Sequence, residues 1–416
     1  MRQGPAGGIA AMCRMWSCSA MGSMSRVATR RTAQYISMLF MPTLAMTGVS
    51  IGCKSRAQKQ SAVADKGPDT SADKERSERP VRADRQSARA DDVPFLKGQL
   101  HAHSSNSGDS QTSPENVAAW YARHGFDFVV FTDHNVITRY RENDDVLLIP
   151  GVELTHNTRR CQPPPEPGMA CLLHVNALFV EDGTSARVDL PVREGDERRA
   201  IYRRSVALAE RLGGVAQLNH PNFHYGADAS SIAELGRHGL TLLEVANEAF
   251  DSNNQGDATH PSTEALWDAV LSQGVVVWGV ATDDAHHYDD AEQARARGED
   301  VFTGDRGFVM VRATRDRAAI AAALRRGDFY SSTGVLLRRV DARDGVLDIE
   351  VSGAEDCDIS FIGERGAVLA HTRGRTARYQ LAPGQRYVRA LIVDGRGARA
   401  FTQPLFQLSA SRPAEQ

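Results

Sequence analysis

The sequence predicts an α/β fold, in which a parallel sheet or barrel is followed by a small all-β unit. Between residues 96 and 281, short apolar strand-like segments alternate with segments of helical periodicity, an order typical of parallel sheets and βα barrels. After residue 338 only short strand-like segments follow, separated by glycine-rich turns, which is typical of a β-sandwich. The chain also holds 13 histidines, and 12 of them lie between His101 and His287.

The first part of the chain is expected to contain seven strands and three helices. The strands are expected at residues 96–100, 127–132, 146–149, 172–180, 215–218, 240–246 and 275–281. The helices are expected at residues 113–124, 197–212 and 262–273, the first with Ser113 as N-cap and Pro114 at its first position. Four strands are expected in the second part, at residues 346–351, 358–362, 377–381 and 387–393.

The first 53 residues have the features of a bacterial export signal. Arg26, Arg30 and Arg31 precede an uncharged apolar stretch at residues 38–52, which has the length of a signal-peptide core. This stretch ends at Cys53 in a sequence that resembles a lipobox, Ser-Ile-Gly-Cys. We therefore expect export to the bacterial cell envelope or periplasm, with lipidated Cys53 as the sole membrane anchor. An ordinary secretory signal is the alternative.

The charged segment at residues 54–92 separates this signal from the fold. It holds ten basic and eight acidic residues, and such a composition predicts a disordered tether. The expected organisation is therefore a signal at 1–53, a tether at 54–92, a barrel at 93–334 and a β-sandwich at 335–410. A formal net charge of −3 gives no basic surface for nucleic acid, so a small-molecule substrate is the expected partner.

Histidines and carboxylates fall at the ends of the predicted strands. In a βα barrel these ends meet on one face, so side chains from distant parts of the sequence can converge there. The His-x-His pair at His101 and His103 directs two imidazoles to the same side of a strand. The candidates outnumber the three or four ligands of one zinc ion. Two or three divalent transition metals (zinc, manganese or iron) that share a carboxylate are therefore expected.

Six motifs, taken in order, resemble the polymerase and histidinol phosphatase (PHP) superfamily of metallohydrolases. They are LKGQLHAHSSNSGD, FTDHN, IPGVEL, LLHV, QLNHPN and ATDDAHH, which lie within residues 96–288. This resemblance implies a distorted (β/α)7 barrel with a multinuclear metal site, and most often phosphoester hydrolysis. The DDAHH run and residues 323–334 resemble the CehA/McbA-type branch, named for carbaryl hydrolases, whose members often carry a small β domain after the barrel.

The resemblance also implies a set of metal ligands. The matching positions are His101, His103, Asp109, His134, Glu153, His174, His220, Asp284 and His286. In this match the first two histidines bind one metal, and Glu153 bridges that metal to a second, which is held by His174 and His220. His134 binds a third metal, and Asp109 stands one residue away from the usual place of its acidic ligand.

Other polar residues near these motifs are assigned supporting roles. Asp133 is expected to assist catalysis by orienting the ligands, and His287 is a candidate proton donor, although a neighbour of a ligand is more often simply packed beside it. Asn135 and Asn222 are candidates for hydrogen bonds to substrate. Glu244 and Asn247, at the end of the sixth predicted strand, are expected to support the pocket.

Cysteines give a separate prediction. Cys161 and Cys171 bracket a proline-rich insert, and in an exported protein they are expected to form a disulfide. Cys357 is expected to be unpaired and buried in the β unit.

The function expected from these observations is an exported metal-dependent hydrolase, in the first place a phosphoesterase. A carbamate, ester or amide hydrolase of the carbaryl-hydrolase type and a non-catalytic metal-binding lipoprotein remain as alternatives. The amidohydrolase superfamily also opens with His-x-His but usually has a bridging lysine, and this chain has no lysine after Lys97.

Overall fold

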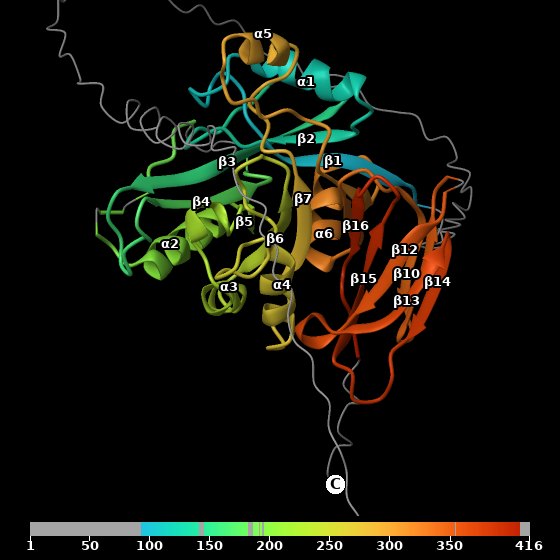
Figure 1. Ribbon diagram of the computed structural model, residues 1–416. Coiled ribbons are helices and arrows are strands. Elements are labelled where there is room, and N and C mark those ends of the chain that lie inside the picture. The colour runs from blue at the N-terminus through green and yellow to red at the C-terminus, as the bar shows by residue number, and fades with distance from the viewer. Residues whose placement is uncertain are drawn as a thin grey trace, which may run out of the picture. The chain divides into compact units, whose positions relative to one another are not determined.

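The computed structural model describes residues 93–140, 145–181, 186–190, 192–193, 195–353 and 355–407 (Figure 1). The expected signal, Cys53 and the charged tether lie outside these residues. Within them, no helix combines the length and the apolar character needed to cross a membrane.

A central sheet carries the seven strands expected in the first part of the chain, hydrogen-bonded in chain order. These strands are β1 (Phe95–Ala102), β2 (Phe128–Phe131), β3 (Leu147–Thr158), β4 (Cys171–Leu178), β5 (Val215–Leu218), β6 (Leu240–Asn247) and β7 (Trp278–Thr282). Most neighbours pair in parallel, but β4 runs antiparallel to both β3 and β5. The prediction of a mixed α/β fold with a mostly parallel central sheet is confirmed.

Helices pack against this sheet and bury its apolar side chains. They are α1 (Pro114–Arg123), α2 (Arg198–Arg211), α3 (Ala229–Gly236), α4 (Thr263–Leu271), α5 (Ala291–Ala296) and α6 (Arg317–Arg326), with a short 3-10 turn, η3 (Phe223–Tyr225), after β5. The expected start of α1 is confirmed, because the Ser113 side chain accepts a hydrogen bond from Asn116 N and Pro114 is the first helical residue. Helices α3, α5 and α6 were not expected from the sequence.

The ladder of hydrogen bonds does not close between β7 and β1. One isolated parallel bridge joins Ala102, the last residue of β1, to Ala285, which lies three residues after β7. On the free edge of β7, Gly279 N donates to Gln403 Oε1 at 2.9 Å, and Gln403 Nε2 donates back to Gly279 O at 2.8 Å. Ser331 Oγ donates to the same carbonyl at 2.7 Å. The backbone N–H and C=O groups of Gly279 are thus paired with side chains, whereas in a closed barrel they would pair with another strand.

The C-terminal part forms two facing sheets, as a β-sandwich does. The central sheet continues from β1 through β8 (Phe308–Arg312), β9 (Phe329–Ser332), β16 (Arg399–Thr402), β15 (Tyr387–Val393), β12 (Cys357–Ile362) and β13 (Val368–Gly374), with β17 (Leu405–Phe406) on β15. A separate antiparallel sheet holds β10 (Leu337–Arg343), β11 (Val346–Val351) and β14 (Thr376–Gln380), and a 3-10 turn, η4 (Glu364–Gly366), follows β12. Side chains of both sheets, including Leu347 and Ile359, share one buried core. Strand β9, before the expected domain boundary at 334/335, pairs with β16, after that boundary, so the two expected parts share one continuous sheet.

A buried ion pair joins α4 to this C-terminal part. Arg389 on β15 is 1% exposed, and its Nε and Nη2 donate to Asp268 at 2.8 and 2.6 Å. The Tyr387 hydroxyl donates to the same carboxylate at 3.0 Å.

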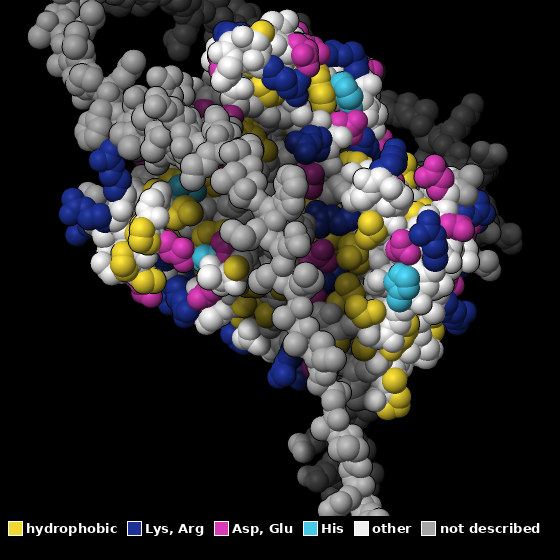
Figure 2. Space-filling model, viewed as in Figure 1, with side chains coloured by type: hydrophobic (Ala, Val, Ile, Leu, Met, Phe, Trp, Pro, Cys, Tyr) yellow, Lys and Arg dark blue, Asp and Glu magenta, His cyan; other side chains and the backbone are white. Residues whose placement is uncertain are grey.

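On the surface, basic and acidic side chains of the described residues alternate over the face seen in Figure 2 without forming a continuous basic area.

Candidate metal centre

The residues expected to bind metal converge at one edge of the central sheet. His101 lies at the end of β1, His103 follows it, His220 follows β5, and Asp284 and His286 follow β7, whereas Glu153 lies within β3. His174 lies near the start of β4, and it reaches the same edge because β4 runs opposite to β3 and pairs it with Thr155. The expectation of side chains gathered from distant strands is confirmed, although one strand arrives from the other direction.

Three groups of side chains could each hold a metal ion, with ligand atoms within 4.8 Å of one another. They are His103, Asp109, His134 and His286; His101, His103 and Glu153; and Glu153, His174 and His220. The second and third groups share Glu153, and the first and second share His103. These groups bring together the residues that the sequence motifs imply as ligands, with His103 within reach of two of them. Asp284 lies beside the second group, because its Oδ1 is 3.2 Å from both His101 Nε2 and His103 Nε2.

Glu153 occupies the centre of the site. It is 1% exposed, and its carboxylate lies close to five imidazoles. The nearest nitrogens are those of His134 at 2.6 Å, His174 at 3.1 Å, His101 at 3.4 Å, and His103 and His220 at 3.6 Å. Burial raises the pKa of Glu153, but His174, His134 and His101 hold it well below its ordinary value. The carboxylate is therefore ionised, as a bridging ligand must be.

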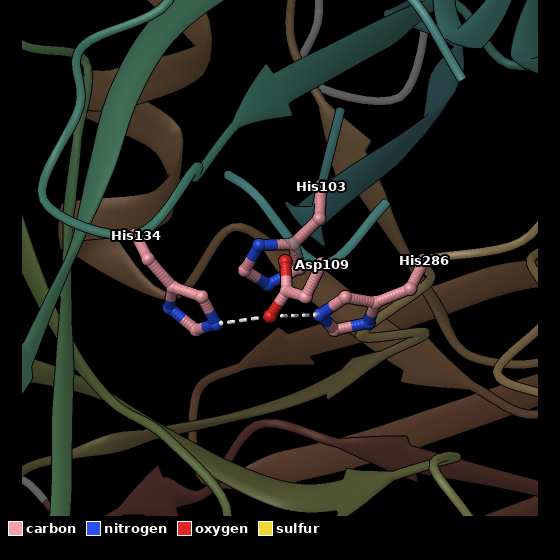
Figure 3. A group of neighbouring side chains, drawn as sticks. All are labelled: His103, Asp109, His134 and His286. Carbon is pink, nitrogen blue, oxygen red and sulfur yellow. Dashed lines mark ion pairs between the residues drawn. The ribbon is translucent and has the colours of Figure 1, made fainter. Parts of the chain in front are cut away.

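Asp109 lies between two histidines on the more exposed side of the site (Figure 3). Its Oδ2 is 2.9 Å from His134 Nε2 and 3.4 Å from His286 Nε2. Its side chain is 38% exposed, whereas His103 in the same group is fully buried. Burial raises the pKa of Asp109, but hydrogen bonds from His134 and His286 lower it far below its ordinary value. The side of the site at Asp109 is thus the side that solvent can reach.

Each of three histidines has its second ring nitrogen fixed by a partner outside the cluster. His101 Nδ1 lies 2.7 Å from Glu244 Oε1, His103 Nδ1 lies 2.9 Å from Ser107 Oγ, and His174 Nε2 lies 2.7 Å from Asn157 Oδ1. Such partners orient metal-binding imidazoles and select their tautomer. The expected supporting role of Glu244 is confirmed by this contact, and Asn247 Nδ2 donates to Glu244 at 2.9 Å.

The donor set fits divalent metal ions. His101 Nε2 and His103 Nε2 are buried and have no hydrogen-bond partner, although both point at the carboxylates of Glu153 and Asp284. Buried polar atoms are rarely left unpaired, so these two nitrogens indicate a ligand. Imidazole mixed with carboxylate suits zinc, manganese or iron.

The two imidazoles of the His-x-His pair differ in their electrostatics. Burial lowers the pKa of His101, but Asp284, Glu244 and Glu153 together hold it well above the ordinary value. Burial, together with the neighbouring His286, lowers the pKa of His103 to about 4. His103 is therefore neutral at pH 7 and ready to donate its lone pair to a metal.

Two candidate ligands and the neighbour of a third have unusual backbone conformations. The φ angles of His220, Asp284 and Asn135 are 23°, 52° and 54°, in the left-handed region that residues other than glycine rarely adopt. Strain of this kind is found at functional sites, where the surrounding structure imposes it.

Asp133 and His287 lie outside the three metal-binding groups. Asp133 is fully buried, and its carboxylate accepts hydrogen bonds from Ser104 N and Ser104 Oγ at 2.6 and 2.8 Å, and from Thr138 Oγ1. It thus fixes the chain that follows His103. Nδ1 of His287 accepts a hydrogen bond from Phe302 N at 3.3 Å, in the segment between α5 and β8. This contact fits the alternative role of His287, a residue packed beside a candidate ligand, better than the role of a proton donor.

Asn135 and Asn222, the candidates for substrate binding, direct their amides to the protein backbone. Asn135 Nδ2 donates to Thr155 O, and Thr155 N donates to Asn135 Oδ1, both at 3.1 Å. Asn222 is 2% exposed, and its Nδ2 donates to Asn253 O at 3.0 Å and to Pro261 O at 2.9 Å. Both side chains position loops of the site, and the amide nitrogens are used in doing so.

Several residues at the site were not expected from the sequence. Asn219 Nδ2 donates to Glu153 Oε1 at 2.8 Å, and Asn157 and Thr155 contact His174 and His134. Since side chains alternate along a strand, the spacing Glu153, Thr155, Asn157 could have placed these last two on the ligand face.

The loop between Cys161 and Cys171 is closed by the expected disulfide. The prediction for Cys357 is confirmed as well, since this cysteine is free and buried on β12. Cys171 is the first residue of β4, three positions before His174, and Cys161 lies three residues after the end of β3, so the bridge ties the segment after β3 to the start of β4.

Comparison with protein-family models and with curated proteins finds no match for this chain. The geometry alone therefore defines the class of site. Several buried groups of histidine and carboxylate side chains could hold divalent metal ions at one edge of a mixed α/β sheet.

Proposed function

We propose that this protein is an exported metal-dependent hydrolase of the PHP type, and that it cleaves phosphoesters. The observation that carries the proposal is the place of Glu153 in two neighbouring groups, to which its carboxylate can offer one oxygen each. The six ordered sequence motifs support the same assignment. With it we propose the distorted barrel that this superfamily has. We also place the protein in the cell envelope, anchored at Cys53, on the basis of the N-terminal sequence.

The chain's own residues divide the work as follows. Glu153 and the imidazoles around it hold the metals, and the fully buried side of the site, at His101 and His103, excludes bulk water. The partly exposed side, at Asp109, His134 and His286, admits the substrate. When bound, the metals supply Lewis-acid activation of water and of the scissile bond. Asp133 and Asn135 keep the ligand loops in place.

Hydrolysis of a carbamate, ester or amide is the second candidate. The resemblance of the DDAHH run and of residues 323–334 to the carbaryl-hydrolase branch supports this candidate.

The test is metal analysis of the purified protein, coupled to turnover of nitrophenyl phosphate, a phosphodiester and a naphthyl carbamate. We expect at least two transition-metal ions per chain, and loss of turnover in His101→Ala. His371→Ala is the matched control, because His371 is on β13 and its side chain is 53% exposed. Full activity in metal-free protein would overturn the proposal, and metal binding without turnover of any substrate would favour the non-catalytic alternative.

A further inference from the structure

A proline-rich strap, defined as residues 162–170, lies between the two cysteines of the disulfide. Hydrogen bonds hold both of its ends to the rest of the molecule. Gln162 N donates to Asp196 O at 3.0 Å, and Ala170 N donates to His224 Nδ1 at 2.8 Å. The tip of the strap stands between these two fixed ends.

One histidine fastens the tip of the strap to the segment between β6 and α4. Glu166 Oε1, at the tip, lies 2.9 Å from His260 Nε2. On the other side of the ring, His260 Nδ1 lies 3.0 Å from both carboxylate oxygens of Asp257. The ring of His260 also stacks on the ring of Tyr225, with centroids 3.5 Å apart and planes inclined by 6°. The imidazole is thus held flat between two carboxylates.

This geometry requires a protonated His260. An imidazole can donate to a carboxylate at each ring nitrogen only when both nitrogens carry a proton. A neutral ring has one N–H group, so that the lone pair of its other nitrogen would face a carboxylate. In agreement, the hydrogen bond to Asp257 raises the pKa of His260 above its ordinary value, and the hydrogen bond to Glu166 adds to this effect against burial. Loss of one proton therefore releases one of the two carboxylates.

Glu166 is the carboxylate that is released, because Asp257 is fixed locally. Asp257 accepts hydrogen bonds from the Tyr225 hydroxyl at 2.7 Å, from Thr259 N at 2.7 Å and from His260 N at 2.9 Å. The bonds from Tyr225 and Thr259 hold the pKa of Asp257 far below its ordinary value, and the same contact raises the pKa of Tyr225 to about 12. Glu166, by contrast, comes from a segment 94 residues away, and its side chain is 55% exposed.

The strap borders a cavity of about 220 Å³. Glu166 and His260 line this cavity together with Asn222 and His224, which follow the candidate ligand His220. Release of the tip would therefore widen a cavity that lies next to the metal centre along the chain.

The other charged groups that line the cavity keep their charge between pH 6.5 and 9. Arg198 stays protonated, as arginines do in proteins. Burial raises the pKa of Asp228, but hydrogen bonds from Ser231 bring it below its ordinary value, so Asp228 stays ionised. Burial lowers the pKa of His224 from its ordinary value of 6.5, so this ring stays neutral and keeps the bond from Ala170 N.

We propose that the strap is a pH-sensitive lid over this cavity, fastened while His260 is an imidazolium and released at its tip when His260 loses its proton. A group whose pKa is raised by its partners stabilises the fastened form below that pKa and ceases to do so above it. The lid should therefore loosen as the pH rises. It does not depend on the proposed hydrolase activity, since Glu166, His260 and Asp257 lie outside the three metal-binding groups.

Hydrogen–deuterium exchange of the full-length protein between pH 6.5 and 9, corrected for the intrinsic effect of pH on exchange, measures the opening of the strap. We expect the protection of residues 162–170 in wild type to fall by roughly two- to fivefold over this range, the size expected for an ion pair near the surface. Glu166→Gln and His260→Gln should give low protection that does not change with pH. Unchanged protection of β4 in both variants shows that they fold.

His371→Gln is the matched control, because His371 Nε2 lies 3.5 Å from Asp358 in an exposed pair on β13, and this variant should keep the wild-type pH profile. A measurement on wild type alone adds a second test, since an NMR titration of His260 should have the same midpoint as the loss of protection. Protection of the strap that does not change with pH in wild type, that falls equally in Glu166→Gln, or that changes with a different midpoint from His260 would overturn the lid.

Discussion

Replacement of Glu244 by glutamine probes how the metal centre is supported from behind. Glu244 is fully buried and accepts five hydrogen bonds, although it is not in any of the three metal-binding groups of the described residues. Its Oε1 accepts from His101 Nδ1 at 2.7 Å, Gln217 Nε2 at 3.1 Å and Thr282 Oγ1 at 2.7 Å, and its Oε2 accepts from His220 N at 2.6 Å and Asn247 Nδ2 at 2.9 Å.

Glu244→Gln keeps the shape but turns one acceptor into a donor. With its NH₂ group at Oε1, the amide faces one partner that can only donate, Gln217 Nε2, because the Thr282 hydroxyl and the His101 ring can also accept, so at least one buried hydrogen bond is lost. At about 1–3 kcal/mol for each unmet bond, the free energy of unfolding should fall by at least about 1–3 kcal/mol. Because the carboxylate also orients His101, metal affinity should fall by roughly 10–100-fold.

Chemical denaturation of metal-free protein measures the first effect, and competition with a chromogenic chelator measures the second. Glu292→Gln is the matched control, since Glu292 lies on α5 with its side chain 84% exposed. An affinity for zinc in Glu244→Gln that equals that of wild type would refute the view that Glu244 orients a ligand.

Three further predictions concern protons, the disulfide and the buried ion pair. Zinc affinity should rise with pH by about tenfold per pH unit for each imidazole that loses a proton when zinc binds. This rise should continue above pH 7, because the pKa values of His101 and His134 are raised. Equilibrium dialysis at several pH values measures the affinity, and an affinity that does not change with pH would contradict the prediction. Cys171→Ser should cost about 2–3 kcal/mol in urea denaturation, as expected for a short loop, and reduction of wild type should add two protons in intact mass. Asp268→Asn should lower the free energy of unfolding by about 3–5 kcal/mol, because Arg389 stays buried without its main partner. The control Asp358→Asn, which removes an exposed ion pair, should lower it by less than about 1 kcal/mol.

The ligand set could be predicted because its pattern is local. A histidine or carboxylate at or just after the end of a buried strand is expected at one edge of the sheet, and this pattern recurs at His101, His220 and Asp284, whereas Glu153 lies within β3. The N-cap of α1 could be predicted as well, since Ser113 and Pro114 act through their immediate neighbours. All nine expected ligands lie in or directly beside the three groups.

What the sequence did not reveal depends on contacts between distant residues. An apolar strand has the same two-residue period in either direction, so nothing in the sequence of β4 indicates that it runs antiparallel. Asn135 and Asn222 stand beside ligands and carry amides suited to a substrate, but their partners are carbonyls of Thr155, Asn253 and Pro261. No local pattern distinguishes an amide that binds substrate from one that braces a loop.

The continuity of the sheet gives the C-terminal strands a part in the metal centre. Asp284 and His286 follow β7, whose free edge is satisfied at Gly279 by Gln403, close to the C-terminal end of the described chain. Helix α4, which packs behind β6 and so behind Glu244, is held by Asp268 to Arg389 on β15. Both strands that end at the site are thus braced by residues beyond 385. The C-terminal sandwich therefore supports the elements that carry candidate ligands, and we expect its loss to disturb the candidate metal centre even though it contributes none of the candidate ligands itself.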